Sequence, residues 1–99
     1  MTKQEIIKQM RQAAADGKIL YTQHAIERMG QRGISRFMVE QCLLAGVSTR
    51  PAYHNTAYQT YECRISHYTA GINYDVVAAI SPKDPNTIIV TVIDTDSES

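Results

Sequence analysis

The stretch SRFMVEQCLLAG, residues 35–46, decides the fold because the periodicity of the chain changes where it ends. Ser35 can cap a helix over residues 36–45, and Gly46 can end it. The apolar residues of this stretch recur at helical spacing: Phe37, Val39, Cys42, Leu43 and Leu44. After Gly46 the apolar residues instead alternate with polar ones, as they do in strands. The sequence therefore predicts helices before residue 46 and a sheet after it.

Two more helices are predicted before this stretch, each with its own start signal. Thr2 and Glu5 form a capping box at the start of the first helix, and Thr22 is the expected N-cap of the second. The two predicted helices cover residues 2–15 and 23–31, with an extended link at 19–21.

Four segments after Gly46 are predicted to be strands. The predicted strands are 47–53, 58–67, 73–81 and 87–94. Pro51 makes the first of them an edge strand. Helices followed by strands, without alternation, are typical of an α+β fold. We therefore expect one domain over residues 1–95, with its helices on one face of a three- to four-stranded antiparallel sheet, and an acidic disordered tail at 96–99.

The composition is that of a soluble folded protein, with 43% hydrophobic and 20% charged residues. The net charge is zero, but residues 1–54 hold eight basic and four acidic residues, a net of +4, and residues 55–99 carry −4. These halves allow a local positive face, or two halves that attract each other. No long apolar run and no signal peptide are visible, so we expect a cytoplasmic protein without a membrane segment.

The remaining chemistry-bearing residue types argue against a metal or a cofactor. Cys42 and Cys63 have no metal-like spacing, and we expect both to be free and buried. The three histidines are scattered, and no glycine-rich phosphate loop is present. We expect neither a bound metal nor a cofactor.

His24 and Arg28 lie four residues apart and so share one face of the predicted second helix, with Arg32 one turn further. An imidazole exchanges protons near neutral pH, and a guanidinium can grip a phosphate through two hydrogen bonds. This pairing is a minimal half-site for RNA cleavage. The alternative is a solvated charged face on which Arg28 pairs with a nearby glutamate.

The predicted strands add further candidates, each with an ordinary alternative. Glu62 and Arg64 share one face of their strand and either face a common ligand or form a surface ion pair. Thr91, between two valines, is either a hydroxyl that faces a site or an ordinary strand residue. Five of the six tyrosines, Tyr61 among them, fall in the sheet half, where they suit either RNA or a protein partner.

The segment YTQHAIERMGQRGIS, residues 21–35, resembles the opening motif of the prokaryotic family called domain of unknown function 4258. Members show Thr/Ser-x-His-Ala, then Arg-Met, then Arg-Gly-Ile-Ser/Thr. The matching residues are Thr22, His24, Ala25, Arg28, Met29, Arg32, Gly33, Ile34 and Ser35. The resemblance continues at the level of pattern to about residue 94.

The resemblance implies a RelE-like fold of the barnase–EndoU–colicin–RelE ribonuclease group and metal-independent RNA cleavage that leaves a cyclic phosphate. It implies that His24 acts as general acid or base and that Arg28 binds the phosphate. It also implies that Arg64 offsets transition-state charge and that Thr91 positions the phosphate or the 2′-hydroxyl. The candidate substrate-binding residues are Arg32, Tyr61 and Glu62.

Two functions follow from these observations. The first is an endoribonuclease toxin that acts on RNA and is neutralised by a cognate antitoxin. The second is a non-catalytic protein-interaction or regulatory module on the same fold, forming a homodimer through a sheet edge or binding another protein. Growth arrest on expression, relieved by substitution of His24, is expected of the toxin and not of the non-catalytic module.

Overall fold

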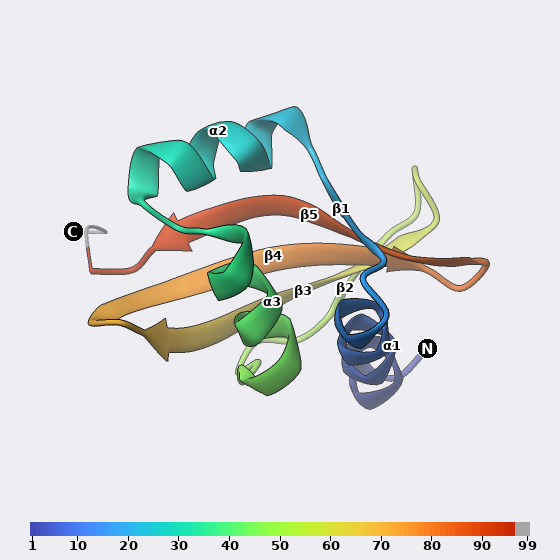
Figure 1. Ribbon diagram of the computed structural model, residues 1–99. Helices are drawn as coiled ribbons and strands as arrows, with labels where there is room; N and C mark the ends of the chain where they lie inside the picture. The colour runs from blue at the N-terminus through green and yellow to red at the C-terminus, as the bar shows by residue number, and fades with distance from the viewer. Residues whose placement is uncertain (97–99) are drawn as a thin grey trace.

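The computed structural model describes residues 1–96 and has three helices beside a five-stranded mixed sheet (Figure 1). The helices are α1 (Lys3–Ala15), α2 (Gln23–Arg32) and α3 (Arg36–Ala45). The strands are β1 (Ile19–Tyr21), β2 (Tyr53–Asn55), β3 (Thr60–Thr69), β4 (Ile72–Ser81) and β5 (Asp84–Asp94), in the order β1-β5-β4-β3-β2. The α+β class predicted from the sequence is confirmed.

The predicted start signals of the helices are present in the structure. Thr2 and Glu5 form the capping box of α1, and the Thr22 and Ser35 side chains accept hydrogen bonds from the first turns of α2 and α3. Gly33 ends α2 in the left-handed conformation, with φ of 68°. Such a conformation favours glycine. The helix ends are thus fixed by local chemistry, as the sequence indicates.

The sheet differs from the expected antiparallel sheet at both of its edges. Residues 19–21 are not a link but a strand, β1, which pairs in parallel with Thr87–Ile89 of β5. At the other edge, Val47 makes only an isolated bridge to Ser66, and β2 begins at Tyr53, after Pro51. Because proline cannot donate to a ladder, the pairing resumes only beyond it. The sheet therefore has five strands and mixed direction.

One face of the sheet carries the core. Ile6 and Met10 of α1 and Val39 and Leu43 of α3 are buried in one cluster with side chains from β3, β4 and β5. The sheet residues of this cluster are Cys63, Ile65, Tyr74, Val76, Ala78, Ile80, Ile89 and Val92. We call the opposite face, which carries Glu62, Arg64, Asp75 and Val77, the open face of the sheet.

Helix α2 lies along β5 at the edge of the sheet (Figure 1). Strand β1 pairs with β5 only as far as Ile89, and no other strand of residues 1–96 lies beside the rest of β5 on this side. Ala25 and Met29 of α2 are buried in the core cluster. The helix thus covers the edge that β1 leaves unpaired, which protects it from pairing with another chain.

A β-bulge in β5 sets the direction of the side chains near α2. Ala78 of β4 pairs with Ile89, but the next partner, that of Val77, is Thr91, so Val90 is an extra residue. Successive strand residues point to opposite faces, and one extra residue reverses the alternation. As a result Ile89 and Val92 both face the core, and Thr91 faces the open side with Val77.

Asp96, the last described residue, is held in place by hydrogen bonds. The side chain of Asp96 accepts hydrogen bonds from the backbone and side-chain nitrogens of Asn73, at 3.1 and 3.2 Å. Asp96, the first residue of the expected disordered tail, is thus attached to the start of β4. The rest of that expected tail, 97–99, lies outside the described residues.

Candidate functional site

Thr22 attaches the start of α2 to β5. Its side-chain oxygen accepts a hydrogen bond from the Ala25 amide at 3.0 Å. The same hydroxyl lies 3.1 Å from the carbonyl oxygens of both Ile89 and Val90, to which it donates. Its backbone amide also donates to Ile89, at 3.2 Å. These bonds fix which face of α2 lies against the strand.

A polar hollow of about 230 Å³ lies between α2 and β5. His24, Arg28 and Arg32 line it from the helix, at successive intervals of four residues that place them on one face. The strand contributes the segment 91–94, which includes Thr91 and Asp94. The structure therefore brings four of the predicted site residues together: His24, Arg28, Arg32 and Thr91.

The basic side chains of this hollow are not engaged by the rest of the described chain. Within residues 1–96, the His24, Arg28 and Arg32 side chains form no hydrogen bond or ion pair. The alternative that Arg28 pairs with Glu27 or Glu40 is thus not realised. His24 is exposed and Arg28 is half-buried, so both are accessible to a ligand from solvent. Two guanidinium groups against one carboxylate, Asp94, make the hollow a suitable place for an anion.

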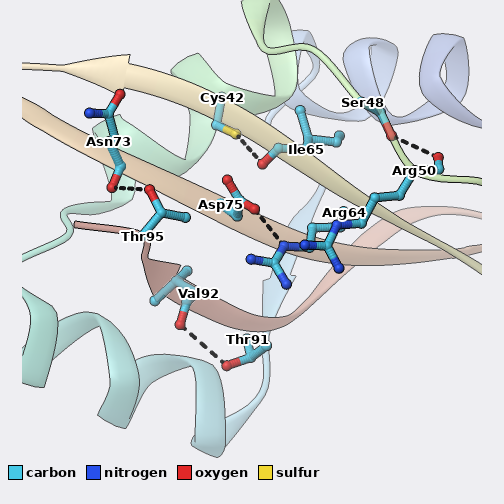
Figure 2. Close-up of polar contacts among 10 residues, drawn as sticks. All are labelled: Cys42, Ser48, Arg50, Arg64, Ile65, Asn73, Asp75, Thr91, Val92 and Thr95. Atoms are coloured by element: carbon cyan, nitrogen blue, oxygen red, sulfur yellow. Dashed lines mark hydrogen bonds and ion pairs between the residues drawn. The ribbon is translucent and has the colours of Figure 1, made fainter. Parts of the chain in front are cut away.

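Arg64 lies apart from this group, two strands away on the open face. It pairs across the sheet with Val77, which pairs with Thr91, so the three form one row. Neighbouring strands are about 4.8 Å apart, which puts the Arg64 and Thr91 backbones roughly 10 Å from each other. The Arg64 guanidinium forms an ion pair with Asp75, whose residue is only 6% exposed (Figure 2).

A second polar hollow, of about 460 Å³, surrounds this ion pair. Arg50, Arg64 and Asp75 line it together with the residues that follow β5, among them Thr95 (Figure 2). Removing a partner from such a half-buried pair leaves a charge without compensation. Arg64 thus has a structural role in the open face, beside the catalytic role that the resemblance implies.

The remaining two candidates, Tyr61 and Glu62, lie on opposite faces of β3. Tyr61 packs against the core and stacks on His54, with ring centroids 4.4 Å apart and an angle of 9° between the planes. Glu62 lies on the open face and lines an apolar hollow. The predicted substrate-binding residues Arg32, Tyr61 and Glu62 therefore lie in three different places.

Sequence reasoning missed two acidic residues near these groups. Asp94 lines the hollow of His24, and its position three residues after Thr91 at the end of a predicted strand is a signal that could have indicated it. Asp75, the partner of Arg64, had no such signal. The proximity of Asp75 to Arg64 depends on the register of β3 on β4, which the sequence does not display.

The two cysteines are free and buried, as predicted. Burial raises the pKa of Cys42 to about 12, and burial also raises the pKa of Cys63. Both thiols therefore stay protonated near neutral pH and are poor nucleophiles. No group of three or more acidic, histidine or cysteine residues within 1–96 is arranged to hold a metal ion. In the same range, no helix has the length and apolar character needed to cross a membrane.

Residues 21–94 match the family described as "Domain of unknown function (DUF4258)". The match covers most of the chain, and the protein belongs to this family. It includes α2, β5 and every residue of the hollow between them. Comparison with curated proteins and with solved structures finds no significant match.

Proposed function

We propose that this protein is a metal-independent endoribonuclease of the toxin type and that RNA is cleaved in the hollow between α2 and β5. The observation that supports this proposal is the meeting of His24, Arg28 and Thr91 in one accessible hollow. These residues come from elements far apart in the chain. They supply a group that transfers protons, a cation for phosphate and a hydroxyl.

The reaction is an attack by the ribose 2′-oxygen on the adjacent phosphorus. His24 takes the 2′-hydroxyl proton, the bond from phosphorus to O5′ breaks, and O5′ gains a proton from solvent, which reaches the exposed hollow. Arg28 and Arg32 bind the non-bridging phosphate oxygens and offset the charge that develops on them. Thr91 orients the 2′-hydroxyl, whereas the charge of Arg64, two strands away, is offset by its ion pair with Asp75. The products are a 2′,3′-cyclic phosphate and a 5′-hydroxyl.

Expression of the protein alone in a bacterial host tests the proposal, together with RNA cleavage by the purified chain in a metal chelator. We expect growth arrest and chelator-resistant cleavage that leaves cyclic phosphate ends. His24→Ala should reduce the cleavage rate about 10²- to 10⁴-fold. His54→Ala is the matched control, because His54 is also exposed but does not line the hollow. Harmless expression of the wild type, with no RNA cleaved, would refute the proposal.

Arginine substitutions test the phosphate contact separately. Arg28→Ala should lower the rate about 10²-fold or more, whereas Arg11→Ala, on the exposed surface of α1, should not. Equal effects of the two variants would point to a general loss of positive charge and against a specific phosphate contact.

A second candidate function is supported by apolar side chains that the fold leaves exposed. Phe37 is 61% exposed on α3, and Val47, which follows that helix, is 63% exposed. Exposed large apolar residues often mark contacts with other proteins. A regulatory module would bind an antitoxin or a second copy of itself through them. Phe37→Ser should then abolish co-purification of the partner, or the homodimer, without affecting any RNA cleavage.

A further inference from the structure

The open face of the sheet contains an apolar hollow of about 460 Å³ beside the proposed cleavage site. Its floor follows one row of paired residues that crosses three strands: Glu62 of β3, Ala79 of β4 and Ile88 of β5. The alanine is the smallest of the three, and the hollow lies over it. The other lining residues are Thr22, Asn55, Tyr58, Thr60 and Val90.

Two polar groups of this hollow, the Glu62 carboxylate and the Asn55 amide nitrogen, form no hydrogen bond with the described part of the protein. The Glu62 carboxylate is half-buried, and no residue within 1–96 forms a hydrogen bond or an ion pair with it. The Asn55 side-chain oxygen accepts from the amides of Ala57 and Tyr58, at 3.1 and 3.4 Å, which leaves its amide nitrogen as a donor. Half-buried polar groups that lack a protein partner bond to solvent, and a ligand in the hollow can take the place of that solvent.

An aromatic ring stands at the rim of the hollow. Tyr58 lies in the turn between β2 and β3 and is 78% exposed. The next residue, Gln59, has a φ of 54°, which a non-glycine residue rarely adopts. An exposed tyrosine beside an apolar floor is the arrangement on which unpaired nucleobases stack.

We propose that this hollow binds one base of the RNA substrate and selects guanine. A carboxylate is an acceptor only, and its two oxygens can receive two adjacent N–H groups. The Watson–Crick edge of guanine presents two such donors, N1–H and the 2-amino group, next to the O6 acceptor. Adenine, cytosine and uracil each present no more than one donor group on that edge. Glu62 would accept from both donors, the Asn55 amide would donate to O6, and Tyr58 would cover the ring.

The position of the hollow joins it to the cleavage site, so the inference rests on the proposed function. Thr22 and Val90 line the apolar hollow proposed to bind the base. His24 and Thr91, which lie one or two residues further along the chain, line the hollow between α2 and β5 proposed to bind the phosphate. Strand residues two apart are about 6.7 Å apart, so the rows of Glu62 and Arg64 are separated by about one nucleotide's length. A base in one hollow and its phosphate in the other therefore require no unusual backbone.

Titration of the purified protein with nucleoside monophosphates, followed by NMR, tests the subsite without requiring cleavage. We expect guanosine monophosphate to bind at least tenfold more tightly than adenosine or uridine monophosphate, with shifts at Ala79 and Ile88. Inosine monophosphate lacks the 2-amino group and should bind with intermediate affinity. Glu62→Gln should remove most of the preference for guanine, and Glu40→Gln, on the exposed surface of α3, is the matched control. Ala79→Leu should fill the hollow and weaken all four nucleotides.

The outcomes distinguish this inference from the proposed function. RNA cleavage with no base preference would overturn the guanine subsite and leave the ribonuclease proposal standing. The same holds if the wild type binds all the nucleotides equally, or if Glu62→Gln keeps the wild-type preference for guanine. Selective binding of guanosine monophosphate by a protein that cleaves no RNA would support the subsite and remove the catalytic proposal. Binding of a protein partner that Ala79→Leu blocks, with no nucleotide bound, would assign the hollow to a protein and overturn the inference.

Discussion

Replacing Gly46 by alanine tests how closely the chain approaches itself where α3 gives way to the sheet. A Cβ atom at this position would lie 2.5 Å from the Cys42 carbonyl oxygen, 2.7 Å from Cγ2 of Ile65 and 2.8 Å from the Ser66 carbonyl oxygen. Two of these atoms belong to the backbone and cannot rotate away. The methyl group can be accommodated only if α3 and β3 move apart.

The size of the effect follows from this crowding. Overpacking a close-packed interior costs about 1–3 kcal/mol, and fixed backbone obstacles place Gly46→Ala toward the upper end. Alanine also lowers the conformational entropy of the unfolded chain, which offsets about 0.4–1 kcal/mol. The net loss of unfolding free energy should be about 2 kcal/mol. For a domain of this size, such a loss lowers Tm by about 8–16 °C.

Thermal and urea unfolding followed by circular dichroism measure this loss. Gly30→Ala is the control, because Gly30 lies in α2, where an added Cβ meets nothing within 4 Å. Alanine should stabilise that helix by about 0.5–1 kcal/mol and raise Tm. The two variants make the same chemical change and should shift Tm in opposite directions. A Gly46→Ala protein as stable as the wild type would refute the reasoning from crowding.

Three other substitutions test features of the fold. Thr22→Val removes both the helix cap and the side-chain hydrogen bonds to β5 but keeps the backbone bond to Ile89, so the free energy of unfolding should fall by about 1–2 kcal/mol in urea titrations. An unchanged value would contradict the attachment of α2 by the Thr22 side chain. Asp75→Asn should cost about 2–4 kcal/mol because Arg64 stays half-buried, and a double-mutant cycle with Arg64→Ala should show coupling, whereas additive losses would argue against the ion pair. Because the pKa of Cys42 is raised from 9.0 to about 12, the folded protein holds a proton that the unfolded chain loses, so stability should be full below pH 9.0 and fall as pH rises from 9.0 to about 12. Cys42→Ala should flatten that decline in pH-dependent urea unfolding, and an equally steep decline in the variant would exclude Cys42 as its source.

The parts of the fold that the sequence predicted are those that depend on near neighbours. Thr2, Thr22 and Ser35 cap their helices through amides three residues away, so the helix starts were readable in the chain. The parallel pairing of β1 with β5 joins Ile19 to Thr87, nearly opposite ends of the described chain. Nothing in the short apolar segment around Ile19 distinguishes a strand from a link, and only the finished sheet does so.

The candidate site divides in the same way. The common face of His24 and Arg28 follows from helical periodicity and was predicted. Thr91 was predicted from the resemblance, but its orientation depends on the bulge at Val90, which the regular alternation of the sequence conceals. Without that extra residue Thr91 would face the core. The separation of Arg64 from His24 likewise depends on the width of two strands, which no local pattern encodes.

The two walls of the hollow, α2 and β5, become available at different times during synthesis of the protein. Synthesis proceeds from the N-terminus, so His24 and Arg28 leave the ribosome long before Thr91 and Asp94 do. Until β5 is complete, α2 has no strand to lie against, β1 has no partner, and the hollow has only one wall. Any activity of this hollow therefore begins only once β5 has been released. The time taken to translate the residues between Arg28 and Thr91 therefore separates the appearance of the helical wall from the completion of the hollow.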